Sequence, residues 1–102
     1  MIYFIYVLKM GGSVLTDPNQ IKNAVETIKK IYADGNSVVV VVSAMKGETN
    51  RLDDIANKLE IHDESDRAEI ISMGERVSAR VMVSTLKANG IDAALVDPML
   101  PD

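Results

Sequence analysis

The 102-residue sequence has no cysteine, no tryptophan and a single histidine. Without cysteine, the chain forms no disulfide and offers no thiolate to a metal, which fits a cytoplasmic protein. Basic residues are also few, 11 against 15 acidic ones, whereas proteins that bind a nucleic-acid backbone gather an excess of Lys and Arg. Long hydrophobic runs are missing too, since no apolar stretch approaches the roughly 20 residues that span a bilayer. The apolar N-terminal residues lack the basic start and the cleavage site of a signal peptide.

These absences lead us to expect a cytoplasmic location, with neither nucleic acid nor membrane as a partner. What the sequence does contain is 47% apolar and 25% charged residues, the composition of one small globular domain. His62 lies among charged residues and is assigned no role. The sequence indicates no residue as a metal ligand.

The first half of the chain predicts strand, helix and strand. Residues 2–8 are apolar without alternation, which is typical of a strand covered on both faces. Asp17 and Pro18 are suited to begin a helix, which continues with apolar residues at spacings of three and four until Gly35. The valine run at residues 37–42 predicts a central parallel strand, also covered on both sides.

The second half predicts two helices and a third strand. Thr49 or Asn50 is suited to cap a helix whose apolar residues extend to Leu59. A longer helical pattern covers residues 66–89 and is followed by Gly90, and residues 91–96 read as a strand. The predicted order is β-α-β-α-α-β, which implies a parallel sheet in a three-layer α/β/α sandwich. Because three strands make a thin sheet, we interpret the chain as the first portion of a larger, incomplete domain.

The first motif that could form a binding or catalytic site is KMGGS, residues 9–13, at the end of the first predicted strand. Ligands of open α/β sheets bind at the carboxyl ends of the strands. Glycines there let backbone N–H groups approach an anion, while the lysine, the hydroxyl and a helix N-terminus add positive charge and donors. The spacing matches neither a P-loop nor a dinucleotide fingerprint. Alone, the motif fits a tight strand-to-helix turn with an exposed lysine better than it fits an anion site.

Two further motifs follow later in the chain. SAMKGETN, residues 43–50, joins the valine strand to a helix start and suits anion binding, or simply an ordinary capped loop. MGERVSA, residues 73–79, puts Gly74 inside a helix, at a cost of about 1 kcal/mol relative to alanine, which indicates close approach of a backbone or a ligand. Glu75 beside it would offer a carboxylate to an ammonium group, or form a solvated pair with Arg76. Lys22, Lys29 and Lys30 are expected on a solvated helix face.

In this order, the three motifs closely resemble the N-terminal part of aspartate kinases, which belong to the amino acid kinase family. The resemblance extends from residue 2 to about residue 97. SAMKGETN points to the aspartate branch rather than to carbamate, acetylglutamate or uridylate kinases. The resemblance implies that residues 1–102 are the N-terminal portion of an amino acid kinase domain whose nucleotide-binding half is absent. One departure is that the family's opening motif usually carries a threonine before its serine, so one hydroxyl is missing here.

For the phosphate side of the site, the resemblance implies four residues. Lys9 would be the catalytic lysine that neutralises the phosphoryl group during transfer. Gly11 and Gly12 would offer backbone donors, and Ser13 a hydroxyl. This division of labour suits phosphoryl transfer, which depends on positioning and charge neutralisation.

For the amino acid side, the resemblance implies three residues. Ser43 and Thr49 would line the phosphate and aspartate side of the site, and Glu75 would hold the α-ammonium group of the substrate. The implied reaction uses ATP with Mg²⁺ and L-aspartate to give 4-phospho-L-aspartate, in the biosynthesis of lysine, threonine and methionine.

Three hypotheses remain at the level of the sequence. The first is the aspartate-binding part of an aspartate kinase, inactive alone unless a complementing C-terminal half or further copies assemble with it. The second is a non-catalytic binding or regulatory subunit that acts by assembly through the exposed edge of its sheet. The third is a kinase of the same family that acts on another small carboxylate or phosphate.

Overall fold

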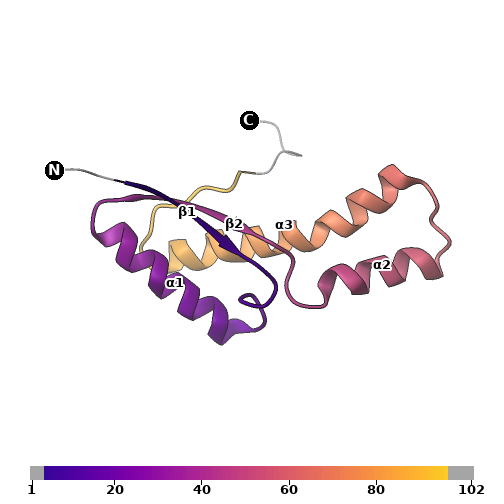
Figure 1. Cartoon of the computed structure of the whole chain (residues 1–102), viewed down its shortest axis with the longest axis horizontal. Helices are drawn as coiled ribbons and strands as arrows, with labels where there is room; N and C mark the ends of the chain where they lie inside the picture. The colour runs from indigo at the N-terminus through magenta and orange to yellow at the C-terminus, as the bar shows by residue number, and fades with distance from the viewer. Residues whose placement is uncertain (1–3, 97–102) are drawn as a thin grey trace.

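A computed structural model describes residues 4–96, in which two parallel strands and three helices follow one another (Figure 1). The elements are, in chain order, β1 (Ile5–Met10), α1 (Pro18–Ala33), β2 (Ser37–Val42), α2 (Glu48–Lys58) and α3 (Glu64–Ala88). β1 and β2 pair in parallel, in a register that runs from Ile5 opposite Ser37 to Met10 opposite Val42. The predicted α/β class with a parallel sheet is confirmed. Residues 2 and 3 of the first predicted strand lie outside the described residues.

The two long helices, α1 and α3, begin and end within a few residues of their predicted limits. The Asp17 side chain accepts a hydrogen bond from the Gln20 amide at 3.0 Å, which satisfies one of the unpaired N–H groups at the start of α1. Asp63 caps α3 in the same way, through the Asp66 amide at 2.9 Å. After α1 and α3 the chain turns at glycines with positive φ, Gly35 and Gly90.

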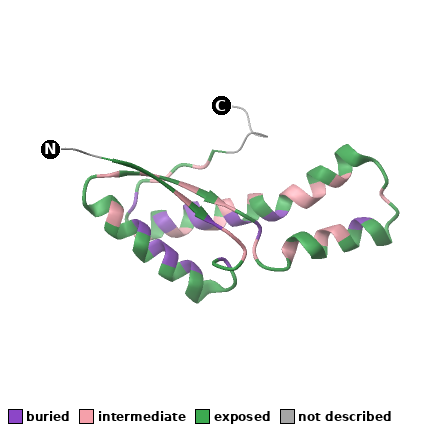
Figure 2. Ribbon diagram, viewed as in Figure 1, coloured by how far each residue is buried: buried purple, intermediate pink, exposed green. Residues whose placement is uncertain are grey.

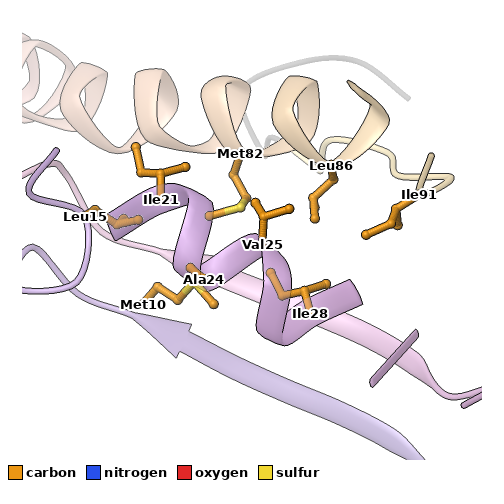
Figure 3. Close-up of a cluster of buried hydrophobic side chains, with 9 residues drawn as sticks. All are labelled: Met10, Leu15, Ile21, Ala24, Val25, Ile28, Met82, Leu86 and Ile91. Carbon is orange, nitrogen blue, oxygen red and sulfur yellow. The ribbon is translucent and has the colours of Figure 1, made fainter. Parts of the chain in front are cut away.

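The core lies between α1 and α3, beside one face of the sheet. Figure 3 shows Val25 and Ile28 of α1 pointing toward Met82 and Leu86 of α3, and all four are buried. Leu8, Val38, Val40 and Val42 of the sheet pack against the same cluster. Figure 2 shows that the buried positions gather here, while the distal part of α2 and α3 is mostly exposed.

The other face of the sheet is open, contrary to the prediction that both faces are covered. Val7 is 60% exposed and Val39 50% exposed, and Ile5 and Val41 lie on the same face. The reason is geometric. Alternate residues of a strand point to opposite faces, and within residues 4–96 the helices pack on one face only. The described residues therefore contribute the sheet and one helical layer of the predicted sandwich.

The predicted strand at residues 91–96 is not formed. Ile91 is buried, but its amide hydrogen-bonds back to Leu86 O at 3.0 Å. Residues 91–96 and β2 line a shared cavity of about 430 Å³, so the segment faces β2 across a gap instead of pairing with it. The apolar pattern of this segment is real, but a strand also requires a backbone partner.

α2 and the first half of α3 form an antiparallel hairpin that projects from the sheet (Figure 1), and the molecule measures 56 × 31 × 21 Å. Arg67 ties the hairpin together by donating hydrogen bonds to Asp53 and Asn57 of α2 and to the Ile61 carbonyl, at 2.7–2.9 Å. The prediction that Thr49 or Asn50 caps α2 is wrong. The helix begins at Glu48 after Gly47, and no side chain caps it.

Candidate functional site

Two loops meet at the carboxyl edge of the sheet, one after β1 and one after β2. The Ser43 amide donates to the Met10 carbonyl at 3.0 Å and so extends the parallel pairing into the loops. A Cβ on Gly12 would lie 3.3 Å from the Ala44 carbonyl oxygen and 3.5 Å from the Lys46 Cα. Gly12 therefore lacks a side chain where the two loops approach each other most closely.

α3 forms the third wall, and Gly74 determines how close it comes. A Cβ on Gly74 would lie 2.9 Å from the Ala44 Cβ and 3.2 Å from the Glu48 Cγ. What comes close to this mid-helix glycine is not a backbone but the side chains of Ala44, in the loop after β2, and of Glu48, in the first turn of α2. This contact brings the next residue, Glu75, to the edge of the same loop.

Between the three walls lies a shallow, open hollow of about 460 Å³, which we call the edge hollow. Five of the seven residues implied by the resemblance line it, and they come from three separate segments of the chain. The residues that line the edge hollow are Gly12, Ser13, Ser43, Ala44, Met45, Lys46, Gly47, Thr49, Asn50 and Glu75.

Lys9 and Gly11 do not line the edge hollow. Lys9 is exposed on β1, and because its neighbours Leu8 and Met10 face the core, strand alternation directs its side chain to the open face of the sheet. Gly11 shapes the turn instead, since its carbonyl accepts from the amides of Val14 and Leu15 at 3.0 and 3.1 Å. The predicted catalytic lysine thus lies outside the hollow that the predicted substrate residues line.

Backbone donors converge on the edge hollow. Among the described residues, the N–H groups of Gly12 and Ser13 have no hydrogen-bond partner. The same holds for Thr49 and Asn50, since the first amides to bond at the start of α2 are those of Glu48 and Arg51. Free N–H groups at a helix N-terminus and in a glycine loop bind anions, and the helix dipole adds positive potential.

Two charged side chains line the edge hollow, Lys46 and Glu75. Neither makes an ion pair with the other or with any other residue between 4 and 96. Glu48, beside the hollow, is different: the Arg51 guanidinium hydrogen-bonds both of its carboxylate oxygens and lowers the pKa of the carboxyl from its ordinary value. As far as the described part of the chain is concerned, the site therefore holds one cation and one anion that no ion pair compensates.

Five further residues line the hollow although no role in the site was expected for any of them individually: Ala44, Met45, Lys46, Gly47 and Asn50. All five belong to SAMKGETN, so the motif identified the right segment. What the sequence could not show is which side chains of the loop turn inward, because that depends on the packing of Gly12 and Gly74.

The free amides and Lys46 make the edge hollow suited to an anionic group. Residues 4–96 contain no group of three or more His, Cys, Asp or Glu side chains arranged to hold a metal ion. None of the helices in that range is long and apolar enough to cross a membrane.

Comparison with known proteins places the chain among kinases. Residues 5–100 match the model of the amino acid kinase family. An aspartate kinase of Stutzerimonas stutzeri is 35% identical over 88 residues, which cover 85% of this chain and 21% of the relative. An aspartokinase of Rickettsia conorii is 38% identical over 104 residues, covering 94% and 26%.

A solved structure agrees with the sequence relatives. The crystal structure of aspartate kinase from Synechocystis superposes with a TM-score of 0.80 at 32% identity, over 89% of this chain and 16% of that one. The chain thus spans about a quarter or less of the length of the relatives that it matches. With a family model that covers nearly every residue and a matching fold, this chain belongs to the amino acid kinase family.

Proposed function

We propose that the chain forms the amino acid-binding part of an aspartate kinase, and that the edge hollow binds L-aspartate. The observation that carries the proposal is the convergence of Gly12, Ser13, Ser43, Thr49 and Glu75, from three segments, on one hollow. The relatives reported above support it, since their names specify aspartate kinase. The proposal includes a cytoplasmic location, which the lack of cysteine supports.

In the proposed reaction, a side-chain carboxylate oxygen of aspartate attacks the γ-phosphorus of ATP. The bond from that phosphorus to the β–γ bridging oxygen breaks, ADP leaves, and 4-phospho-L-aspartate forms. The residues of this chain contribute positioning and charge. The Glu75 carboxylate holds the α-ammonium group, and the free amides of Gly12 and Ser13 face the transferred phosphoryl group. Mg²⁺ would travel with the ATP phosphates and neutralise their charge.

Lys9 is proposed to approach the phosphoryl group from the open face of the sheet. It is the penultimate residue of β1, next to the loop that carries Gly12, so the two lie at the same edge of the sheet. A phosphoryl group bound against that loop would lie between Lys9 and the edge hollow, where a lysine supplies a point charge. The rest of the nucleotide site is proposed to come from a complementing C-terminal half or from an assembled copy.

Formation of an acyl phosphate tests this function. The chain is combined with the polypeptide encoded directly downstream, and ATP, Mg²⁺ and L-aspartate are added. Hydroxylamine then traps 4-phospho-L-aspartate as a hydroxamate. We expect hydroxamate that depends on both ATP and aspartate, and none with Lys9→Met. Absence of product with every supplied partner would reject the kinase proposal, and product with another carboxylate but not with aspartate would favour a different substrate in the same family.

A second candidate, a non-catalytic subunit that acts by assembly, is favoured by the open face of the sheet. Ile5 and Val7 of β1 and Val39 and Val41 of β2 present apolar side chains there, from 48% to 74% exposed. Apolar faces of this kind mark interaction sites. Sizing chromatography tests this second candidate. A well-behaved monomer with a cooperative thermal transition would remove the reason to suppose assembly.

A further inference from the structure

Lys46 is the one cation that lines the edge hollow within residues 4–96. Its position is held by the backbone, because the Lys46 N and Cα lie 3.6 and 3.5 Å from the place where a Gly12 Cβ would be. The Lys46 side chain therefore leaves the backbone where the loop after β2 contacts the loop after β1. An exposed loop lysine is ordinarily a solvated surface charge, but the backbone of this one packs against Gly12, and the residue lines the hollow.

The charges of the edge hollow match an amino acid with an acidic side chain. Glu75 lies on α3 and Lys46 lies in the loop after β2, so the two charges come from different walls of the hollow, and the two side chains do not pair with each other. If Glu75 holds the α-ammonium group, as the proposed function requires, a ligand that spans the hollow presents its far end to Lys46. For aspartate that end is the side-chain carboxylate, which is also the group next to the phosphoryl-facing loop.

We propose that Lys46 binds the side-chain carboxylate of the substrate and so makes the site select acidic over amide side chains. The inference rests on the proposed function and adds to it a specificity-determining residue. An ammonium donating to a carboxylate makes a charge-assisted hydrogen bond, which a neutral amide accepts less strongly. Lys46 thereby supplies, from this chain alone, the contact that distinguishes aspartate from asparagine.

The test compares the dissociation constants of L-aspartate and L-asparagine by isothermal titration calorimetry. For the unaltered chain we expect asparagine to bind about tenfold more weakly, the size of one hydrogen bond to a charged group. In Lys46→Met this ratio should fall toward one through weaker aspartate binding, and Lys46→Arg should keep most of it. Lys29→Met, an exposed lysine of α1 outside the hollow, is the control with the same change in charge and should leave the ratio unaltered.

The inference would be overturned if the ratio of the asparagine and aspartate dissociation constants stayed the same in Lys46→Met while the circular dichroism spectrum was unaltered. The proposed function would then still stand. The inference would also be overturned by a Lys46→Met variant that loses binding of inorganic phosphate while it keeps the aspartate ratio, since Lys46 would then serve the phosphate. A chain that binds neither amino acid would overturn both the inference and the proposed function.

Discussion

At the scale of the residue, the edge hollow depends on side chains that are missing as much as on those present. Gly12 and Gly74 leave the space in which two loops and a helix come together, and Lys46 and Glu75 then supply the charges. Glu75 could be predicted because it sits in a recognisable motif beside a costly mid-helix glycine. Lys46 could not, since nothing in the order of residues separates an anchored loop lysine from a solvated one.

Lys9 shows the opposite limit of prediction. The motif KMGGS indicates a cation at a strand end, and in the structure Lys9 is exposed at the penultimate position of β1. The face of the sheet to which the Lys9 side chain points depends on which residues of β1 face the core. Because the neighbouring Met10 is buried in the core, Lys9 points to the other face. Registry is a property of the packed molecule, so the motif alone could not predict that Lys9 lies outside the hollow.

The pair formed by Glu48 and Arg51 predicts a specific pH dependence. Arg51 hydrogen-bonds the Glu48 carboxylate, so the folded pKa of Glu48 lies below its ordinary value. A depressed carboxyl pKa gives stability that is present above the ordinary pKa and is lost as the pH falls through the folded value. We expect Arg51→Gln to raise the Glu48 pKa back toward the ordinary value, as measured by NMR titration of the side-chain carboxyl. Lys58→Gln, on the same helix but paired with Asp54, is the control and should leave the Glu48 pKa in place.

At the scale of the element, helix ends follow local chemistry and could be predicted wherever a side chain or a glycine marks them. Asp17 and Gly35 bound α1 as expected. The start of α2 was misplaced because Gly47 caps it by adopting a left-handed backbone, with φ of 82°, rather than by a side-chain bond. The strand predicted at residues 91–96 does not form, because a strand requires a hydrogen-bonding partner that can lie far away in the sequence.

Gly74→Ala tests how α3 meets the loop after β2. The new Cβ would lie 2.9 Å from the Ala44 Cβ, closer than real carbon contacts allow, and Ala44 is buried. Overpacking of this kind costs roughly 1–3 kcal/mol, against about 1 kcal/mol gained in helix propensity. We expect a lower melting temperature together with weaker L-aspartate binding. Ser84→Ala, at an exposed position of α3, makes no such contact, and an equal effect there would contradict the account.

The end of α2 predicts a stabilising substitution. Glu60 has φ of 57°, and the amides of Ile61 and Glu60 bond to the carbonyls of Ala56 and Asn57, which is the Schellman arrangement. A left-handed backbone costs a non-glycine residue roughly 1 kcal/mol. We expect Glu60→Gly to raise the free energy of unfolding by about that amount in urea denaturation. Glu60→Ala keeps the strain and should give no such gain, so equal stabilisation by both would contradict this explanation.

At the scale of the whole molecule, one face of the sheet is covered and the other is open. The valine run of β2 was predicted to be buried on both sides, because an unbroken apolar strand is typical of a covered parallel sheet. Within residues 4–96 only the face of Val38, Val40 and Val42 packs on helices. The sequence thus carries the signature of a surface that binds something further, although it could not specify what.

The open face predicts self-association of the 102-residue chain. Val39 and Val41 are about half exposed, and removing apolar area from water favours contact between copies. We expect sedimentation velocity to show association that rises with concentration, and Val39→Thr with Val41→Thr to reduce it without unfolding the chain. Val40→Thr, on the core-facing side, should instead lower stability. An unaltered chain that stays monomeric at every concentration would contradict the prediction.

The central claim is that the edge hollow binds L-aspartate, and an NMR titration with aspartate tests it most directly. The account predicts amide shifts at Gly12, Ser13, Thr49 and Asn50, with a dissociation constant that rises at least about tenfold in Glu75→Gln, because a charged partner is lost. Glu69→Gln, on the same helix outside the hollow, should bind normally. Shifts confined to the cavity between β2 and residues 91–96, or equal affinity in Glu75→Gln, would contradict it.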